Sequence, residues 1–291
     1  MFKGTITAIV TPIKNDKIDY SSYEKLLDFQ IKNKINGILV AGCTGEPATL
    51  NYDEHKELIK FTVDYVNKKI PVIAGTGSNN TKEAIELTEY AEKVGADAAL
   101  LITPYYNKPT QKGLYLHYKE VANSVSIPII LYNVPSRTGI SIEPETVAKL
   151  SEIENIVGIK EASGSLDQVS KILTLVKRED FFVLSGDDSL TLPIISVGGK
   201  GVVSVASNIV PSMVSQMVEY ALNGDFQNAQ KLHIKLFPIF KILFIETNPI
   251  PVKTCLSLMG MINPEWRSPL CGPSEENLEK IKKTIKEFGL I

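Results

Sequence analysis

The sequence predicts a TIM-type (β/α)8 barrel followed by a C-terminal helical extension. Eight short apolar runs recur over about 220 residues with helical patterns between them, which is the size and count of such a barrel. Each run is apolar throughout rather than alternating, as in strands covered on both faces. A doubly wound open sheet is the competing fold, but it usually has fewer strands, and no glycine-rich dinucleotide fingerprint follows the first run.

The predicted elements follow in chain order. The strands are TITAIV from Thr5, GILVAG from Gly37, PVIAGTG from Pro71, AALLITP from Ala98, PIILYNVP from Pro128, IVGIKEA from Ile156, FFVLSGDD from Phe181 and GVVSVASN from Gly201. Helical patterns cover residues 52–69, 80–95 and 164–177. The third pattern begins with Ser165, a suitable N-cap, and the second closes with Gly95.

The chain changes character after Gly224, where the strand signals stop. Residues 227–244, 249–262 and 274–289 then have the pattern of three helices. No internal repeat or low-complexity linker separates this part from the rest. We therefore predict a catalytic barrel over residues 1–224 and a helical region over residues 225–291 that packs on it.

Composition narrows the class of protein. The 291 residues are 44% hydrophobic and 22% charged, with a net charge of −2, so there is no basic surplus for binding nucleic acid. Three cysteines without a CxxC pair indicate a reducing compartment. The N-terminus lacks the apolar region of a signal peptide, and no apolar run approaches ~18 residues. We therefore predict a cytoplasmic protein without membrane spans.

Barrel enzymes place their sites at the C-terminal ends of the strands, so residues at those ends are the candidates. Lys160 ends the sixth predicted strand among apolar neighbours. A lysine that extends its amine to water is the usual alternative. Burial favours the neutral amine, which can attack a ketone and form a Schiff base.

Three other strand ends carry polar groups with a chemical use. Tyr132 ends the fifth strand and is either a packed core tyrosine or a proton donor beside the lysine. Arg137, in the following loop, is either a surface arginine or a bidentate ligand for a carboxylate. The turn Gly42-Cys43-Thr44-Gly45 offers backbone N–H groups to an anion, unless it is a plain strand-to-helix turn.

Taken together, these motifs resemble the dihydrodipicolinate synthase (4-hydroxy-tetrahydrodipicolinate synthase) family over essentially the whole chain. The matching segments are MFKGTITAIVTP, GCTGEPATLNYDEH, PVIAGTGSNN, TPYYNKPTQKGLY, LYNVPSRTG, VGIKEASG, LSGDDSLTLP, GGKGVVSVASN and FIETNPIPVKT. The wider superfamily includes N-acetylneuraminate lyase and sugar-acid aldolases, which use a lysine Schiff base with pyruvate or another 2-keto acid.

The resemblance implies a lyase of lysine and diaminopimelate biosynthesis that condenses pyruvate with L-aspartate 4-semialdehyde. It implies that Lys160 forms the imine with pyruvate, and that Thr44 with the backbone of Cys43 holds the pyruvate carboxylate. Tyr132 acts as general acid and base, and Tyr106 reaches across a dimer interface to pass protons to solvent. The imine is the electron sink, so no metal and no dissociable cofactor is implied.

The resemblance also implies residues that shape the pocket. Gly186 and Val203 offer backbone carbonyls, and Arg137 binds the carboxylate of the second substrate. Neuraminate lyases generally lack an arginine at this loop position, so Arg137 favours a small carboxylated aldehyde over a sugar.

One position departs from the family pattern. The motif usually reads Gly-Thr-Thr-Gly-Glu, and Cys43 here replaces the hydroxyl that links the two tyrosines of the proton relay. A thiol is a weak hydrogen-bonding group. Cys43 performs the relay, a water molecule replaces it, or the substrate differs; we hypothesise the first. We also predict that the site is sensitive to oxidation if the Cys43 thiolate is stabilised.

The resemblance further implies inhibition by lysine at a dimer-interface cleft, and a homotetramer or a dimer. The matching cleft positions are Ala48, Tyr52, His55, Gly77, Asn79, Glu83 and Tyr105. Sensitive members carry histidine where Tyr52 stands. A polar, solvated interface without a ligand is the alternative.

Two other functions stay open at this point. A sugar-acid aldolase would keep Lys160 and Tyr132 but use Arg137 differently. A barrel that binds a 2-keto acid without turnover is the second alternative, and only Cys43 favours it. Aldehyde preference separates the first from the synthase, and pyruvate-dependent stabilisation without product would indicate the second.

Overall fold

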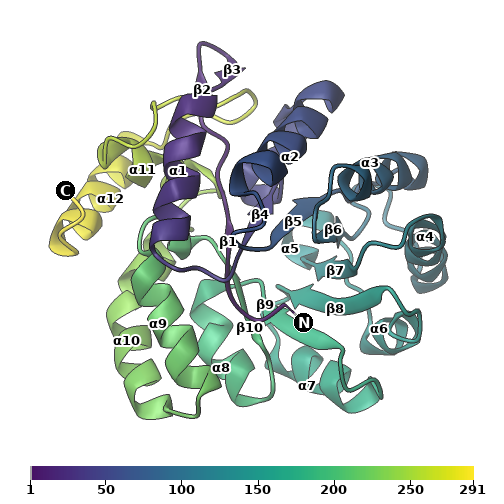
Figure 1. Cartoon of the computed structure of the whole chain (residues 1–291). Helices are drawn as coiled ribbons and strands as arrows, with labels where there is room; N and C mark the ends of the chain where they lie inside the picture. The colour runs from purple at the N-terminus through teal and green to yellow at the C-terminus, as the bar shows by residue number, and fades with distance from the viewer. Residues whose placement is uncertain (1) are drawn as a thin grey trace.

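The structure is a computed structural model that describes residues 2–291, and it contains the predicted closed barrel (Figure 1). Within these residues eight parallel strands pair in the order β1-β10-β9-β8-β7-β6-β5-β4 and close on one another. Their bounds are Gly4–Ala8 (β1), Gly37–Val40 (β4), Val72–Gly75 (β5), Ala98–Ile102 (β6), Ile129–Asn133 (β7), Ile156–Glu161 (β8), Phe182–Ser185 (β9) and Gly201–Ser204 (β10). Each lies within, or starts one residue before, its predicted run.

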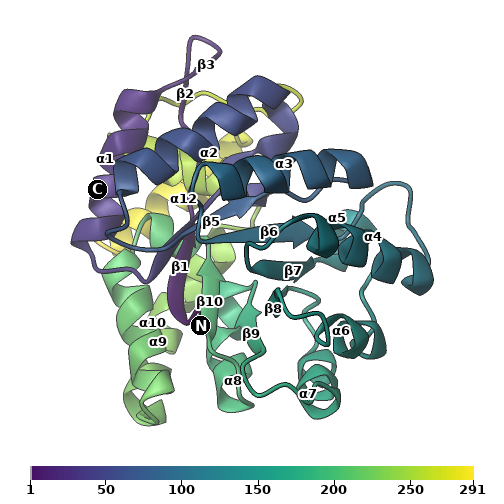
Figure 2. The same cartoon turned by 45° about the vertical axis from the view of Figure 1, so that its right-hand side comes forward.

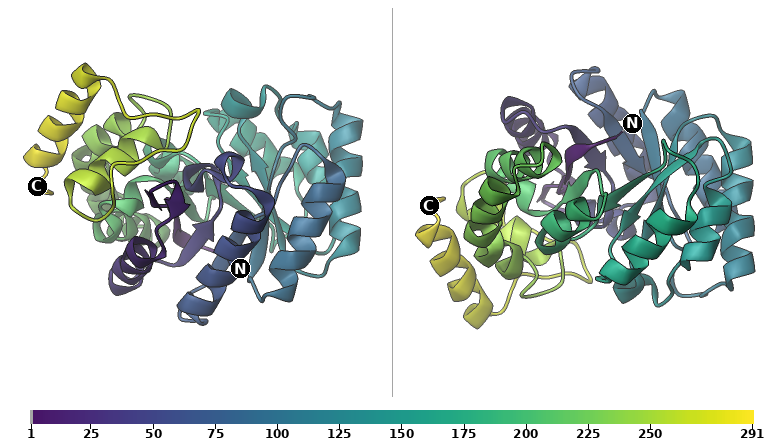
Figure 3. Two further views of the ribbon diagram at one scale, coloured as in Figure 1. Left: turned by 90° about the horizontal axis from the view of Figure 1, so that it is seen from above. Right: turned by 90° about the horizontal axis from the view of Figure 1, so that it is seen from below.

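Helices surround the strands, as Figure 1 and the two turned views of Figure 3 show. The helices up to residue 222 are Tyr20–Lys32 (α1), Tyr52–Val66 (α2), Thr81–Lys93 (α3), Gln111–Ser124 (α4), Pro135–Thr138 (α5), Pro144–Leu150 (α6), Leu166–Leu175 (α7), Thr191–Ser196 (α8) and Pro211–Leu222 (α9). Short 3₁₀ turns occupy Cys43–Gly45, Pro47–Thr49, Asp188–Leu190 and Ala206–Asn208.

Local sequence signals explain where the predicted helices start and stop. Asn51 and Glu54 form a reciprocal capping box at the start of α2, and the Ser165 hydroxyl accepts from the Gln168 N–H at the start of α7. The helix α2 ends three residues before its predicted limit because Asn67 adopts a left-handed conformation with φ 46°.

Both faces of the strands are buried, as the continuous apolar runs require. Side chains inside the barrel form one cluster, which includes Ile6, Leu39, Ile130, Phe182 and Leu184. Alternate side chains on the same strands face the surrounding helices in two larger clusters. The alternation fixes which strand-end residues point into the barrel and which point outward.

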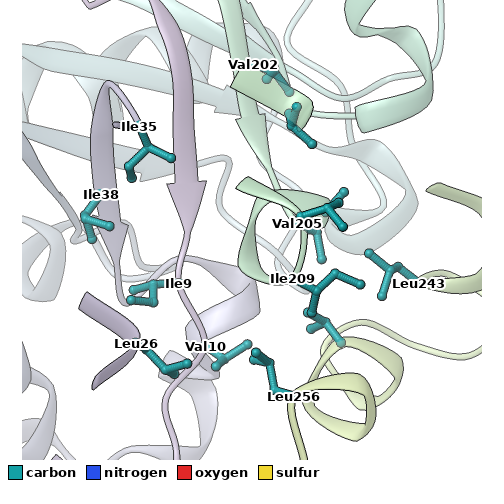
Figure 4. Close-up of a cluster of buried hydrophobic side chains, with 14 of the residues drawn as sticks. Ile9, Val10, Leu26, Ile35, Ile38, Val202, Val205, Ile209, Leu243 and Leu256 are labelled. Atoms are coloured by element: carbon teal, nitrogen blue, oxygen red, sulfur yellow. The ribbon is translucent and has the colours of Figure 1, made fainter. Parts of the chain in front are cut away.

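The C-terminal helices are Phe226–Ile242 (α10), Ile250–Leu258 (α11) and Glu275–Glu287 (α12). The helix α10 packs against α9, and the two lie side by side in Figure 2. Figure 4 shows how this part joins the barrel: Leu243 and Leu256 belong to the same buried cluster as Ile9 and Val10. The division at residue 224 therefore separates two stretches of sequence that share a hydrophobic core.

The sequence analysis did not include a small hairpin, β2 (Ile13–Lys14) and β3 (Lys17–Ile18). Asn15 and Asp16 form its turn with φ of 53° and 60°, which is the backbone of a type I′ turn. Separately, none of the helices over residues 2–291 is both long and apolar enough to span a membrane.

Candidate active site

Lys160 lies near the C-terminal end of β8 with its side chain directed into the barrel. Only 4% of the residue is exposed. The space beneath it is filled by Phe182, whose ring lies so close to Gly158 that a Cβ there would come within 2.5 Å. This burial lowers the pKa of Lys160 to about 8, with a further lowering from Arg137 that the Cys43 and Asp188 side chains oppose. A substantial fraction of the amine is therefore neutral near pH 7.5, which is the form that attacks a carbonyl.

Tyr132 stands beside this lysine on the neighbouring strand β7. The two residues are paired in register, and the Lys160 Nζ lies 4.0 Å from the centre of the Tyr132 ring. Burial and the adjacent Cys43 side chain raise the pKa of Tyr132 well above its usual range. The phenol stays protonated at neutral pH and can donate a proton to a group bound at Lys160.

The turn after β4 places Thr44 within the same part of the barrel mouth. Thr44 is buried, and its Oγ1 accepts a hydrogen bond of 3.0 Å from the Asn248 side chain. The backbone carbonyl of Asn248 in turn accepts from the Arg137 Nη2 at 2.8 Å. Asn248 therefore connects the predicted pyruvate-carboxylate turn to the predicted second-substrate arginine. The sequence analysis did not single it out.

Gly186 directly follows β9, and Val203 lies in β10. The Gly186 N–H donates to the Glu161 carbonyl at 2.8 Å, and a Cβ at Gly186 would lie 3.2 Å from the Lys160 Cε. The same Cβ would lie 2.6 Å from the Ala162 Cβ, so only glycine fits this position without a shift of its neighbours. Val203 is buried inside the barrel in register with Ile6 of β1.

Asp188, just beyond β9, holds the end of β10. Its carboxylate accepts from the Ser204 hydroxyl and from the backbone N–H groups of Val205 and Ala206 at 3.0 and 2.9 Å. Burial raises the pKa of Asp188 to about 6. The sequence analysis included this residue in the SGDD motif without giving it a role.

A cavity of about 590 Å³ opens at the barrel mouth beside these residues. Cys43, Tyr132 and Arg137 line one part of it. The other part is lined by residues predicted for the lysine cleft: Ala48, Tyr52, His55, Gly77, Glu83 and Tyr105. Residues of both predicted sites therefore line one cavity, although Lys160 and Thr44 are not among its lining residues.

Within the predicted lysine cleft the polar groups have partners in the chain. The Glu83 carboxylate accepts from the Ser78 hydroxyl at 2.8 Å, and His55 Nε2 lies 2.8 Å from the Gly75 carbonyl oxygen. The Tyr52 hydroxyl donates to Glu86 at 2.8 Å. Asn79 donates to the backbone carbonyl of Tyr105 at 3.2 Å.

Tyr106 lies apart from Lys160 and Tyr132 within this single chain. It is 90% exposed and has a positive φ of 73°, so its side chain is presented to the outside. The chain therefore does not bring Tyr106 into its own site. The predicted relay across an interface requires a second copy of the chain.

A buried ion pair beneath the cavity is a further feature that the sequence analysis missed. Lys253 Nζ of α11 lies 2.7 Å from Glu46 Oε1, and the two side chains are 1% and 2% exposed. Burial lowers the pKa of Lys253, and the Glu46 charge opposes that shift. Glu46 directly follows the Cys43–Gly45 turn, so the pair attaches that turn to the C-terminal helices.

Among residues 2–291, His, Cys, Asp and Glu side chains do not gather in groups of three that could hold a metal ion.

The barrel fold and these groups at the C-terminal ends of its strands are those of an enzyme of the lyase class. The chain belongs to the dihydrodipicolinate synthetase family, whose sequence profile matches residues 1–288. It is 55% identical to the 4-hydroxy-tetrahydrodipicolinate synthase of Thermodesulfovibrio yellowstonii and 54% identical to that of Methanocaldococcus jannaschii, with all of both chains covered in each case. Among solved structures, dihydrodipicolinate synthase from Aquifex aeolicus superimposes with a TM-score of 0.98 at 50% identity over 99% of both chains. The enzyme from Thermotoga maritima also gives a TM-score of 0.98, at 46% identity over the full length of both.

Proposed function

We propose that this chain is a 4-hydroxy-tetrahydrodipicolinate synthase that condenses pyruvate with L-aspartate 4-semialdehyde through an imine on Lys160. The observation that carries the proposal is the buried Lys160 amine, with a pKa of about 8, over the ring of Tyr132. Full-length identity above 50% to enzymes of that name supports the choice of reaction. The reaction belongs to lysine and diaminopimelate biosynthesis, and we place the enzyme in the cytoplasm.

The first half-reaction uses the pyruvate ketone. The neutral Lys160 amine attacks C2, and loss of one water molecule forms the imine. Removal of a proton from C3 gives an enamine, with the protonated imine nitrogen as the electron sink. Tyr132 is the general acid and base for these proton transfers, and Thr44 with the Cys43 backbone holds the carboxylate. The imine performs this task without a metal or a dissociable cofactor.

The second half-reaction forms the carbon–carbon bond and the ring. The enamine carbon attacks the aldehyde carbon of L-aspartate 4-semialdehyde, whose oxygen takes up a proton. The amino group of that substrate then attacks the imine carbon and releases the free Lys160 amine. Arg137 is exposed, lines the cavity and is held by Asn248, so its remaining N–H groups are placed to bind the substrate carboxylate.

We further propose that the working enzyme is a homo-oligomer, either a dimer or a dimer of dimers. The support is Tyr106, which is 90% exposed and suits a relay only if it enters the site of a neighbouring copy. A structural relative at 45% identity is described as a monomeric dihydrodipicolinate synthase variant. Sedimentation of the wild type and a Tyr106→Ala variant, with kcat measured for both, tests the assignment.

Feedback inhibition by lysine is proposed for the part of the cavity lined by His55, Glu83 and Tyr105. The Glu83 carboxylate offers an acceptor for an ammonium group. A related structure, from Cyanidioschyzon merolae, is described with lysine bound. Millimolar lysine that leaves both activity and melting temperature unchanged would refute this part of the proposal.

The test of the reaction is product formation from pyruvate and L-aspartate 4-semialdehyde. We expect turnover by the wild type, loss of turnover in Lys160→Met, and poor use of sugar aldehydes. Efficient aldol cleavage or synthesis with a sugar acid, without turnover of the semialdehyde, would assign the chain to the sugar-acid aldolases instead. Pyruvate-dependent stabilisation with no product from any aldehyde would indicate a binding protein.

A further inference from the structure

Behind the catalytic residues lies a second pair on the same two strands. Lys160 and Tyr132 are paired in register across β8 and β7 and face the barrel interior. The next residues, Glu161 and Asn133, are also paired in register. Because side chains alternate along a strand, this second pair points outward, between the barrel and its helices.

The outer pair is buried and hydrogen-bonded. Glu161 is 2% exposed and Asn133 is fully buried. The Asn133 Nδ2 donates to the two Glu161 oxygens at 2.9 and 3.3 Å, and the Ser163 N–H donates to the same carboxylate at 2.6 Å. These contacts join the ends of β7 and β8 at the level of the catalytic lysine and tyrosine.

Asn133 also holds the segment that follows the Arg137 loop. Its Oδ1 accepts from the Ile142 N–H at 3.0 Å, and its Nδ2 donates to the Ser141 hydroxyl at 3.1 Å. The Gln168 side chain of α7 donates to the Ile142 carbonyl at 2.8 Å. The pair thus sits at the junction of both catalytic strands and the loop that carries the substrate-binding arginine.

At position 161 these contacts require a side chain that accepts hydrogen bonds and donates none. Burial raises the pKa of Glu161, and the hydrogen bonds from Ser163 and Asn133 oppose that shift. Burying a carboxylate is costly unless its oxygens are bonded, so a residue that served only packing would be apolar here. A glutamine would direct its NH₂ group at either the Asn133 NH₂ or the Ser163 N–H, and one donor would lose its acceptor.

We propose that Glu161 and Asn133 are a positioning pair, which sets the spacing of Lys160 and Tyr132 and anchors the loop of Arg137 for the reaction. The inference rests on the proposed function, because it concerns the same lysine. It predicts that changing the outer pair slows chemistry at the inner pair, although neither outer side chain reaches the substrate.

The experiment compares Glu161→Gln with the exchanged double variant Glu161→Gln plus Asn133→Asp. In the exchange, the carboxylate introduced on β7 accepts from the amide NH₂ introduced on β8 and from the Ile142 N–H. The oxygen of that new amide accepts from the Ser163 N–H. The matched control is Glu154→Gln, the same chemical change at an exposed position just before β8. Competent sites are counted by borohydride trapping of pyruvate, and kcat is expressed per trapped site.

We expect kcat per trapped site to fall about 10- to 100-fold in Glu161→Gln, the range associated with small misplacements of catalytic groups. The exchange should recover most of that loss, and Glu154→Gln should match the wild type. If Glu161→Gln does not fold, Asn133→Ala replaces it, with the same expected fall.

Two results would overturn the proposal. One is a kcat per trapped site in the single variant within about twofold of the wild type, since a residue needed only for folding changes the number of sites and not their rate. The other is an exchange variant that melts like the wild type but regains no activity. A wild type that neither traps pyruvate nor forms product would instead refute the proposed function, and the two failures are therefore distinguishable.

Discussion

The buried pair Glu46–Lys253 offers a stability prediction whose size follows from its burial. The two side chains are 1% and 2% exposed and 2.7 Å apart, so each charge depends on the other for solvation. Lys253→Met removes the ammonium and leaves the Glu46 carboxylate buried without a counter-charge. Breaking a buried pair in this way costs about 3–5 kcal/mol of unfolding free energy.

For larger domains each kcal/mol lowers the melting temperature by about 2–4 °C, so Lys253→Met should melt about 6–20 °C below the wild type. Neutralising both partners, in Glu46→Gln plus Lys253→Met, should recover at least half of that loss because no unpaired charge remains. The matched control is Lys280→Met. Its ion pair with Glu276 on α12 is exposed, and its loss should cost less than about 1 kcal/mol.

The assay is thermal unfolding followed by circular dichroism, repeated in urea for the free energy. A Lys253→Met protein that melts within about 2 °C of the wild type would refute the reasoning, since the pair would then not be desolvated. Because Glu46 directly follows the turn of Cys43 and Thr44, we also expect a raised KM for pyruvate in the folded fraction of Lys253→Met.

Three further predictions concern the reaction itself. Burial lowers the pKa of Lys160 to about 8. The rate of imine formation with pyruvate should therefore rise about tenfold per pH unit up to that pH and then level off. A rate that continues to rise to pH ~10 would indicate a solvated amine. Arg137→Ala should lower kcat/KM for the semialdehyde about 10- to 100-fold, the value of one charge-assisted hydrogen bond, with trapping of pyruvate unchanged. Equal losses in both half-reactions would contradict the assignment. The kcat of Cys43→Ser should stay within about tenfold of the wild-type value if the thiol already performs the relay. A variant that is faster by many orders of magnitude would show that the thiol does not perform it.

The fold was predictable because its signals are local and repeated. The stretches Ile129–Leu131 and Ile156–Ile159 are apolar at every position, which distinguishes strands covered on both faces from half-exposed ones. The hairpin at Ile13–Ile18 lacked such a signal, because strands of two residues are too short to show a pattern and only the Asn15-Asp16 turn marks them.

The candidate site was predictable for residues that lie at the C-terminal ends of strands, where barrel enzymes place their sites. Lys160 and Tyr132 end strands, and barrel geometry brings strand ends together. Pairings between distant segments were not predictable. Glu46 and Lys253 are 207 positions apart, and Lys253 lies in a pattern that indicates only a helix. Asn248 reaches Thr44 over a similar separation, and nothing local in the sequence specifies that contact.

Glu161 shows a different limit. It follows the catalytic lysine directly, and period-two alternation predicts that it faces away from the substrate. A glutamate is almost never fully buried unless it is paired, and nothing local in the sequence indicates Asn133 as its partner, so burial of Glu161 was not expected. In the structure Glu161 is 2% exposed, and Gln168 of α7 donates to the hydroxyl of Ser141, which also contacts Asn133.

The proposed reaction depends above all on Lys160 as the residue that bonds covalently to pyruvate. The most direct measurement is reduction of the enzyme with borohydride in the presence of pyruvate, followed by peptide mass spectrometry. We predict one reduced pyruvate adduct per chain, on Lys160, and its absence without pyruvate or in Lys160→Met. An adduct on another lysine, or an enzyme that forms product while Lys160 stays unmodified, would contradict the account.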